Sequence, residues 1–322
     1  MAVKTAPPRL RLAALPTALM EAPRLAAELG IAGRLLVKRD DLTGFAVAGN
    51  KARPLELLAA AAVAEGADVL VTGGTPGSNF CQATAATAAR LGMACELIYA
   101  GNGPGPDHAN ARAARHWGAH IRWTGQSDRS SVDTALGTVA ADIRAGGGRP
   151  YVMPRGGATP LGSLGYYLAA HELAEQLEGP ALMVIAAGSG GTLSGLLAGA
   201  LAIERPWTIV GASVSRPPEQ TEARVLDLAT RCAELMSTRP PVAADIHIHD
   251  ARGPGHGLPS AEGGRAAAVA LRTEGLILDP VYTAKALGAL PAIRERCGEP
   301  DLTTVFWHTG GLLDAVQEWE NQ

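Results

Sequence analysis

The sequence has few aromatic residues, no basic block and no long apolar run. Only 4% of its 322 residues are aromatic, while 47% are hydrophobic, so alanine, leucine and valine must build the core. The net charge of −3, spread along the chain, argues against nucleic acid as the main partner. No apolar run has transmembrane length, and Pro16 interrupts the Ala/Leu-rich N-terminal stretch. We therefore expect a cytoplasmic protein without a membrane segment or signal peptide.

Cysteines and metal-ligand patterns are also scarce. The four cysteines lie far apart in the chain and have no metal-binding spacing. We expect them to be reduced thiols buried in the core. The segment His247–Asp250 (HIHD) alternates two histidines, which share one face in a strand, but no further ligand stands at zinc-like spacing. The sequence therefore predicts no metal site.

Short apolar runs alternate with alanine-rich helical stretches along the chain. This alternation is typical of βαβ units and parallel sheets, and the length is sufficient for two domains. The Gly/Pro-rich segment 252–264 is expected to be a loop, and long loops in compact chains are often functional. Strands are predicted at residues 68–73, 94–99, 120–123, 182–187, 207–214 and 303–307, and helices at 82–92, 107–118 and 193–201.

Lysine is the rarer of the two basic residues. The chain has only four: Lys4, Lys38, Lys51 and Lys285. Unlike arginine, lysine loses its proton when it is desolvated and can then attack a carbonyl group. Asn50 and Lys51 lie in GFAVAGNKARPLE at a predicted helix start, where backbone N–H groups favour anions. Lys51 is therefore a candidate nucleophile; the alternative is a solvated lysine at a helix terminus.

A glycine-rich turn directly follows the predicted strand 182–187 and opens a helix. Glycines allow close backbone approach to an anion, and the helix N-terminus directs N–H groups toward it. The turn matches neither a Walker loop nor the full dinucleotide fingerprint, so it suits a small monophosphate better; the alternative is a tight turn. Its residues are Gly188, Ser189, Gly190, Gly191 and Thr192.

A third candidate site lies at Gly77-Ser78-Asn79, after the predicted strand 68–73. Ligands of open parallel sheets bind at the carboxyl ends of strands. A hydroxyl, an amide and free helix N–H groups suit a substrate carboxylate, although helix capping alone would also explain Ser78. An amine, a phosphate site and a carboxylate site together are what an aldehyde phosphate cofactor and an amino-acid substrate require.

With these motifs in order, the chain resembles the 1-aminocyclopropane-1-carboxylate (ACC) deaminase and D-cysteine desulfhydrase family of pyridoxal-phosphate (PLP) enzymes. The resemblance implies the α/β fold of the tryptophan-synthase-β-like group (fold type II), with two domains. Each is an open, twisted, mostly parallel sheet flanked by helices. Residues 1–52 and 162–322 would form the large PLP-binding domain and 53–161 a smaller inserted domain, in a homodimer. The segments that carry it are LPTALMEAPRLAAELG, VKRDDLTGFAVAGNKARPLE, TGGTPGSNFCQATAATAARLG, VMPRGGATPLGSLGYYLAA, AAGSGGTLSGLLAG, GASVSRP, EGLILDPVYTAKALGAL and FWHTGGL.

The resemblance also assigns roles to residues. Lys51 would carry the cofactor as a Schiff base and remove the α-proton. Ser78 and nearby amides would bind the substrate carboxylate, and Tyr282 matches an active-site tyrosine. Cofactor contacts would come from Asn50, Asn79 (to the phenolic oxygen), the turn Gly188–Thr192 and Thr283, and substrate contacts from Ser78, Asn79, Phe80 and Gly157.

Three positions bear on the choice of substrate. Thr283 stands where ACC deaminases of the family carry glutamate beside the pyridine nitrogen, and a hydroxyl there favours β-elimination over cyclopropane opening; the alternative is a purely structural role for Thr283. His256 replaces the tyrosine that is usual in its loop, and it could act as an acid or a base or be a solvated loop residue. Phe80 replaces a usual histidine and makes the pocket more apolar.

The sequence thus predicts a PLP-dependent, D-cysteine desulfhydrase-like lyase acting on a β-substituted amino acid. Its products would be a 2-oxo acid, ammonia and the leaving group. The alternatives are an ACC deaminase and a non-catalytic protein that binds PLP or an amino acid. The expected partner is a small amino acid, with no nucleic acid and no membrane.

Overall fold

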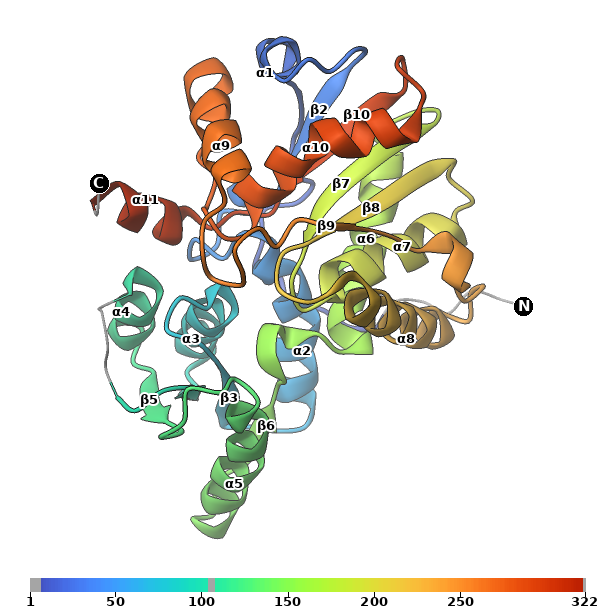
Figure 1. Ribbon diagram of the computed structural model, residues 1–322. Coiled ribbons are helices and arrows are strands. Elements are labelled where there is room, and N and C mark those ends of the chain that lie inside the picture. Colours follow the sequence, from blue (N-terminus) through green and yellow to red (C-terminus); the bar gives the residue numbers. More distant parts are fainter. Residues whose placement is uncertain (1–6, 104–107, 321–322) are drawn as a thin grey trace.

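The structure is a computed structural model that describes residues 7–103 and 108–320 (Figure 1). Within these residues the strands form a six-stranded sheet and a four-stranded sheet, both mostly parallel and covered by helices. The predicted α/β fold class is confirmed. None of the described helices combines the length and apolar character needed to cross a bilayer.

The six-stranded sheet is parallel except for its edge strand β1, which runs antiparallel to β2. Consecutive side chains of a strand point to opposite faces, so Met183 and Ile185 pack under α6, α7 and α8. Leu182 and Val184 pack on the other face, under α1, α9 and α10. In spatial order its strands are β1 (Leu19–Glu21), β2 (Leu35–Arg39), β10 (Thr303–His308), β7 (Ala181–Ala187), β8 (Trp207–Ser213) and β9 (His247–Asp250).

The four-stranded sheet is entirely parallel and lies in the lower part of Figure 1. Leu70 and Leu97 pack into a core with α2, α3 and α4, whereas Val71 and Ile98 pack against α5. In spatial order its strands are β5 (His120–Trp123), β4 (Ala94–Tyr99), β3 (Val69–Gly74) and β6 (Pro150–Val152).

Several helices are rich in alanine and glycine, which permits close packing. A Cβ atom on Gly195 of α7 would lie 1.9 Å from the carbonyl oxygen of Ser163 in α6, so only glycine allows this helix contact. The α-helices are α1 (Pro23–Glu28), α2 (Ala52–Ala64), α3 (Asn79–Leu91), α4 (Ala109–His116), α5 (Ser131–Ala145), α6 (Pro160–Ala174), α7 (Gly191–Ala202), α8 (Pro218–Met236), α9 (Ala261–Glu274), α10 (Thr283–Cys297) and α11 (Leu312–Glu320). Single 3₁₀ turns are η1 (Asp40–Leu42), η2 (Gly49–Lys51), η3 (Arg155–Gly157) and η4 (Ala243–Asp245).

All six predicted strands and all three predicted helices are present, with ends shifted by a few residues. The predicted loop 252–264 was wrong at its end, because Ser260 caps α9 by accepting a hydrogen bond from Gly263 N. The strands of the small sheet all come from residues 69–152. The domain boundaries after residues 52 and 161 stay a prediction.

A buried ionic cluster lies where β2 is followed by η1. The Asp40 carboxylate accepts two hydrogen bonds from Arg53, at 2.8 and 2.9 Å, and one each from Trp307 and Tyr166. Glu172 of α6 accepts from Arg53 and from Lys38 Nζ. These charges are paired and almost fully buried, so they fix the first turn of α2 to the large sheet.

Candidate active site

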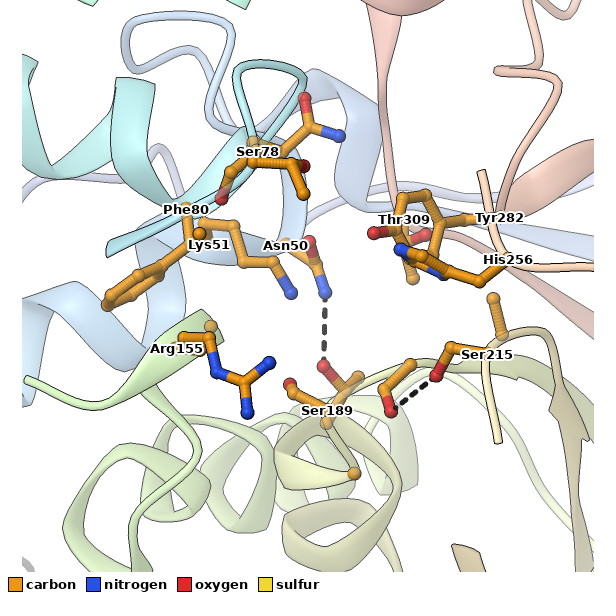
Figure 2. A pocket seen from close by; sticks show the side chains of 18 of the residues that line it. Asn50, Lys51, Ser78, Phe80, Arg155, Ser189, Ser215, His256, Tyr282 and Thr309 are labelled. Carbon is orange, nitrogen blue, oxygen red and sulfur yellow. Dashed lines mark hydrogen bonds between the residues drawn. The ribbon is translucent and has the colours of Figure 1, made fainter. Parts of the chain in front are cut away.

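A cavity of about 310 Å³ lies between the carboxyl ends of strands from both sheets (Figure 2). Its wall includes Gly73 and Gly74 at the end of β3 and Gly188 just after β7. This location is common for ligands of parallel sheets, and the volume is in the range of small-molecule sites. Eleven of the predicted site residues line it: Asn50, Lys51, Ser78, Asn79, Phe80, Gly188, Ser189, Gly190, Thr192, His256 and Tyr282.

Lys51 ends η2, and its amine points into the cavity, toward the space between Ser78 and Ser189 in Figure 2. Burial lowers the pKa of its amine to about 8, against the opposing effect of the Asp279 carboxylate. The deprotonated amine is therefore accessible near neutral pH. Among the described lysines, Lys38 and Lys285 are buried and bonded to oxygen atoms. Lys4 lies outside the described residues.

The predicted phosphate site is a tight turn between β7 and α7. Gly190 adopts φ +94°, a left-handed conformation that favours glycine, and it precedes the first turn of α7. A Cβ atom on Gly188 would lie 3.0 Å from the Tyr282 ring. Asn50 Nδ2 donates to Thr192 Oγ1 at 3.0 Å, so the turn is connected to the segment that carries Lys51 (Figure 2). The turn presents backbone N–H groups to the cavity at a helix N-terminus.

The predicted carboxylate site is the N-terminus of α3. Ser78 is the N-cap residue, and its Oγ accepts a hydrogen bond from Cys81 N at 3.2 Å. The side chain of Asn79 donates to Asp314 Oδ2 of α11 at 3.2 Å. Asn110 donates to the other Asp314 oxygen at 2.6 Å. Burial, followed by the charge of Asp279, raises the pKa of Asp314 to about 7.

Tyr282 and His256 lie together on the side of the cavity opposite Phe80 in Figure 2, with ring centroids 6.4 Å apart. Burial raises the pKa of the Tyr282 phenol to about 12, with a further contribution from Asp279. Burial, followed by the Arg129 charge, lowers the pKa of His256 to about 4. At neutral pH both groups are therefore uncharged, and Tyr282 is the one that holds a transferable proton on oxygen.

Within the part of the chain that the structure describes, three predicted site residues do not line the cavity but pack behind its wall. Thr283 is fully buried, and its hydroxyl donates to Asp279 Oδ1 at 2.6 Å. Gly191 packs on Ala158, and Gly157 leaves room for the Phe80 ring, which a Cβ atom there would approach to 2.4 Å. The Thr283 hydroxyl thus contacts a carboxylate that itself lines the cavity.

Several lining residues were missed by the sequence analysis. Asp279 lies in the quoted segment DPVYTAK, and its carboxylate accepts backbone N–H bonds from residues 281–283. Thr309 follows β10 in the quoted segment FWHTGGL, which was its available signal. Four arginines also line the cavity: Arg129, Arg155, Arg216 and Arg224. Arg155 and Arg216 lie in the segments VMPRGGATPLGSLGYYLAA and GASVSRP, which was their available signal, whereas Arg129 and Arg224 had none.

Comparisons with known proteins agree on one family. The model of a family described as "Pyridoxal-phosphate dependent enzyme" matches residues 10–310. The chain is 37% identical over 320 residues to a D-cysteine desulfhydrase of Salmonella paratyphi B, which covers 94% of each chain, and equally to that of Salmonella newport.

Solved structures share the fold. An ACC deaminase homologue superposes with a TM-score of 0.90 at 33% identity, covering 98% of this chain and 95% of that one. The L-serine ammonia-lyase of the fungus Rhizomucor miehei has a TM-score of 0.69 at 17% identity, covering 97% of this chain and 99% of its own. This second similarity bears on the fold alone.

Proposed function

Because the chain belongs to the pyridoxal-phosphate dependent enzyme family, it uses PLP, and we propose that it is a lyase acting on a β-substituted amino acid. The reaction consumes the amino acid and one water and gives a 2-oxo acid, ammonia and the protonated leaving group. With cysteine, the leaving group is hydrogen sulfide. The D-cysteine desulfhydrases of Salmonella support this reaction class. The observation that carries the proposal is the Lys51 amine, with its lowered pKa, facing a cavity with two helix N-termini.

The described residues fit PLP. An amine able to lose its proton near neutrality suits the aldehyde. Most of the Gly188–Thr192 turn lines the cavity at the start of α7, and a Cβ atom on Gly188 would lie 3.0 Å from the Tyr282 ring, so the turn is close-packed there. We propose that Lys51 holds the cofactor, that the turn binds its phosphate, and that Asn50, Asn79 and Thr283 support it. Thr283 would act through Asp279, to which it is hydrogen-bonded. When bound, PLP supplies an electron sink for negative charge at the substrate Cα.

Lys51 is proposed to take the proton from the substrate Cα. Its lowered pKa keeps a useful fraction of the amine deprotonated at neutral pH, which is the condition for a general base. Its position at the first turn of α2 is fixed by the buried cluster of Arg53, Asp40 and Glu172. The base is therefore held on a rigid element, which favours a reproducible geometry for proton transfer.

The substrate carboxylate is proposed to bind at the N-terminus of α3. Free N–H groups of the first helical turn and the Ser78 hydroxyl would donate to it. Phe80 is 1% exposed, and we propose that it and Gly157 close this end of the cavity against water. An apolar wall strengthens the hydrogen bonds beside it.

Tyr282 is proposed to give the proton to the leaving group. Its raised pKa keeps the phenol protonated throughout the neutral range. His256, neutral for the reason given above, would serve as a hydrogen-bond partner on the same side of the cavity rather than as a cation.

The test is a 2-oxo acid assay of the purified holoenzyme with D-cysteine, L-cysteate, O-acetylserine and ACC. We expect product from one or more β-substituted amino acids and not from ACC. Product from ACC alone would show an ACC deaminase, the activity after which one structural neighbour is named. A change in the visible absorbance of the cofactor without product, across a broad amino-acid panel, would show a binding protein.

We propose further that the protein is a cytoplasmic homodimer with the domain division given by residues 53–161. The four cysteines are free, which suits a reducing compartment. Leu312, Val316 and Trp319 are exposed at helical spacing on α11, a face that a second copy could cover. Light scattering of the purified protein measures the oligomeric state, and fractionation of source cells measures the compartment.

A further inference from the structure

The cavity has more positive charge than its own carboxylates balance. Arg129 and Arg155 reach it from the small-sheet side, and Arg216 and Arg224 from the loop after β8 and from α8. Asp133 forms an ion pair with Arg155, with contacts of 2.6 and 2.9 Å. Among the described residues, the other three guanidinium groups have no carboxylate within ion-pair distance.

These guanidinium groups are also crowded. Burial lowers the pKa of Arg216, and Arg224 and Arg129 lower it further. Burial also lowers the pKa of Arg129, and Arg155 adds to that effect. The Nε atom of Arg129 is buried without a hydrogen-bond partner among the described residues. Burying like charges and an unpaired donor is costly, so the arrangement is stabilised when an anion binds between them.

The two anions already assigned have other donors. Backbone N–H groups of the α7 and α3 N-termini serve a phosphate and an α-carboxylate. Arg216 donates to the carbonyl of Gly188, and Arg224 donates to the carbonyl of Ser189 at 2.6 Å, which holds both at the rim of the glycine turn. Arg129 and Arg216 both line the cavity and both interact electrostatically with His256 and Tyr282, on the side proposed to receive the leaving group.

We propose that the substrate carries a leaving group with an oxyanion on its β-carbon, a sulfonate or a phosphate ester, which Arg129 and Arg216 bind and which departs as sulfite or phosphate. This inference rests on the proposed function and narrows its substrate class. The planar guanidinium group matches two oxygen atoms of an oxyanion, whereas a thiol is a weak hydrogen-bond partner. The arginines therefore select for oxyanion substrates over cysteine.

The experiment compares Arg129→Met with Arg144→Met, an exposed arginine on α5 outside the cavity. The probes are both enantiomers of cysteate and O-phosphoserine, with cysteine and β-chloroalanine as substrates without an oxyanion side chain. Arg129→Met lowers the preference in kcat/KM for cysteate over β-chloroalanine by at least about tenfold, the effect of losing one charged hydrogen bond. Arg144→Met leaves this preference unchanged. An equal preference in the wild type and Arg129→Met overturns the inference, as does a wild type that prefers cysteine.

A binding measurement separates this inference from the proposed function. Cysteate is titrated into the holoenzyme and the visible absorbance of the cofactor is followed, with thermal melting as a check that each variant is folded. Arg216→Met is the second variant if Arg129→Met does not fold. Arginine-dependent cysteate binding without any 2-oxo acid supports the inference and contradicts the lyase. The opposite result is turnover of β-chloroalanine while cysteate does not bind, or binds equally well without Arg129 or Arg216. That result supports the lyase and overturns the inference.

Discussion

Two sets of basic residues in the molecule differ in their partners. In the buried cluster, Arg53 pairs with Asp40 and Glu172, and Lys38 pairs with Glu172. The cavity arginines, Arg129, Arg216 and Arg224, have no carboxylate partner among the described residues. In the buried cluster, Lys38 and Arg53 donate hydrogen bonds to the carboxylate oxygens of Asp40 and Glu172. The cavity arginines pair with no carboxylate, and the Nε atom of Arg129 is buried without a hydrogen-bond partner among the described residues. A satisfied cluster holds its surroundings in place, while an unsatisfied one is completed by a ligand.

The largest expected effect concerns Lys51, which lines the cavity and stands two residues before Arg53 in the chain. Lys51→Ala lowers kcat by at least about a thousandfold, because the proposed base and the cofactor's attachment are both lost. Lys51→Arg is the matched variant: it keeps the charge without a deprotonated amine, so it is equally inactive. Steady-state assays with added PLP measure both, and borohydride trapping with peptide mapping checks the attachment. An active Lys51→Arg would show that Lys51 contributes only its charge to the structure and is not needed as a deprotonated amine.

The next effect tests the buried cluster around Arg53. Arg53→Met leaves Asp40 as an uncompensated buried carboxylate and costs about 3–5 kcal/mol of unfolding free energy, measured by urea denaturation. Arg34→Met, which breaks the exposed pair with Glu21, costs less than about 1 kcal/mol. By contrast, Arg129→Met relieves crowding and does not destabilise the protein. If Arg129→Met lowered the free energy of unfolding as much as Arg53→Met does, the distinction between the buried cluster and the cavity arginines would be lost.

A smaller effect distinguishes the roles of Tyr282 and His256, the two rings beside the cavity arginines. Tyr282→Phe removes the proposed proton donor and lowers kcat about a hundredfold, the usual contribution of general acid catalysis. His256→Asn, at a residue that is neutral at the same pH, lowers kcat less than about tenfold. The two variants are assayed with the same substrate at neutral pH. The reverse order would assign the proton transfer to His256.

The smallest effect concerns Asp314, a carboxyl that has amide partners, Asn79 and Asn110. Its pKa is about 7 in the folded protein, against 3.8 ordinarily. Between these values the folded state keeps a proton that the unfolded state has lost. Its stabilising contribution is therefore complete below the lower pKa and disappears as the pH rises through about 7. Asp314→Asn removes this loss, so its melting temperature gains on the wild type as the pH rises from about 5 to about 8.

Asp142→Asn on the exposed face of α5 is the control for Asp314, and we expect it to show no such pH-dependent gain. A constant difference between Asp314→Asn and the wild type across the pH range would contradict the prediction. That result would mean that Asp314 is charged in the folded protein, like Asp40 and Glu172 in the buried cluster.

The sequence predicted what depends on neighbouring residues. Strands such as 182–187 are continuous apolar runs, and the glycine turn that follows one of them has a local signature. It could not predict the arginine cluster, because residues 129, 155, 216 and 224 meet only when the two sheets come together. Thr283 shows the same limit: its place in a motif was visible, but its burial behind Asp279 depends on the packing of α10.

The proposed cofactor and carboxylate sites consist largely of main-chain N–H groups at the starts of α7 and α3. Main-chain atoms are the same whichever residue is encoded, so point substitutions reach these donors only by distorting the backbone. The arginines that line the cavity are side chains on separate segments, so each is exchanged by a substitution at its own position. A descendant of this chain can therefore acquire a new substrate by changing a few codons for these side chains while inheriting the main-chain sites intact.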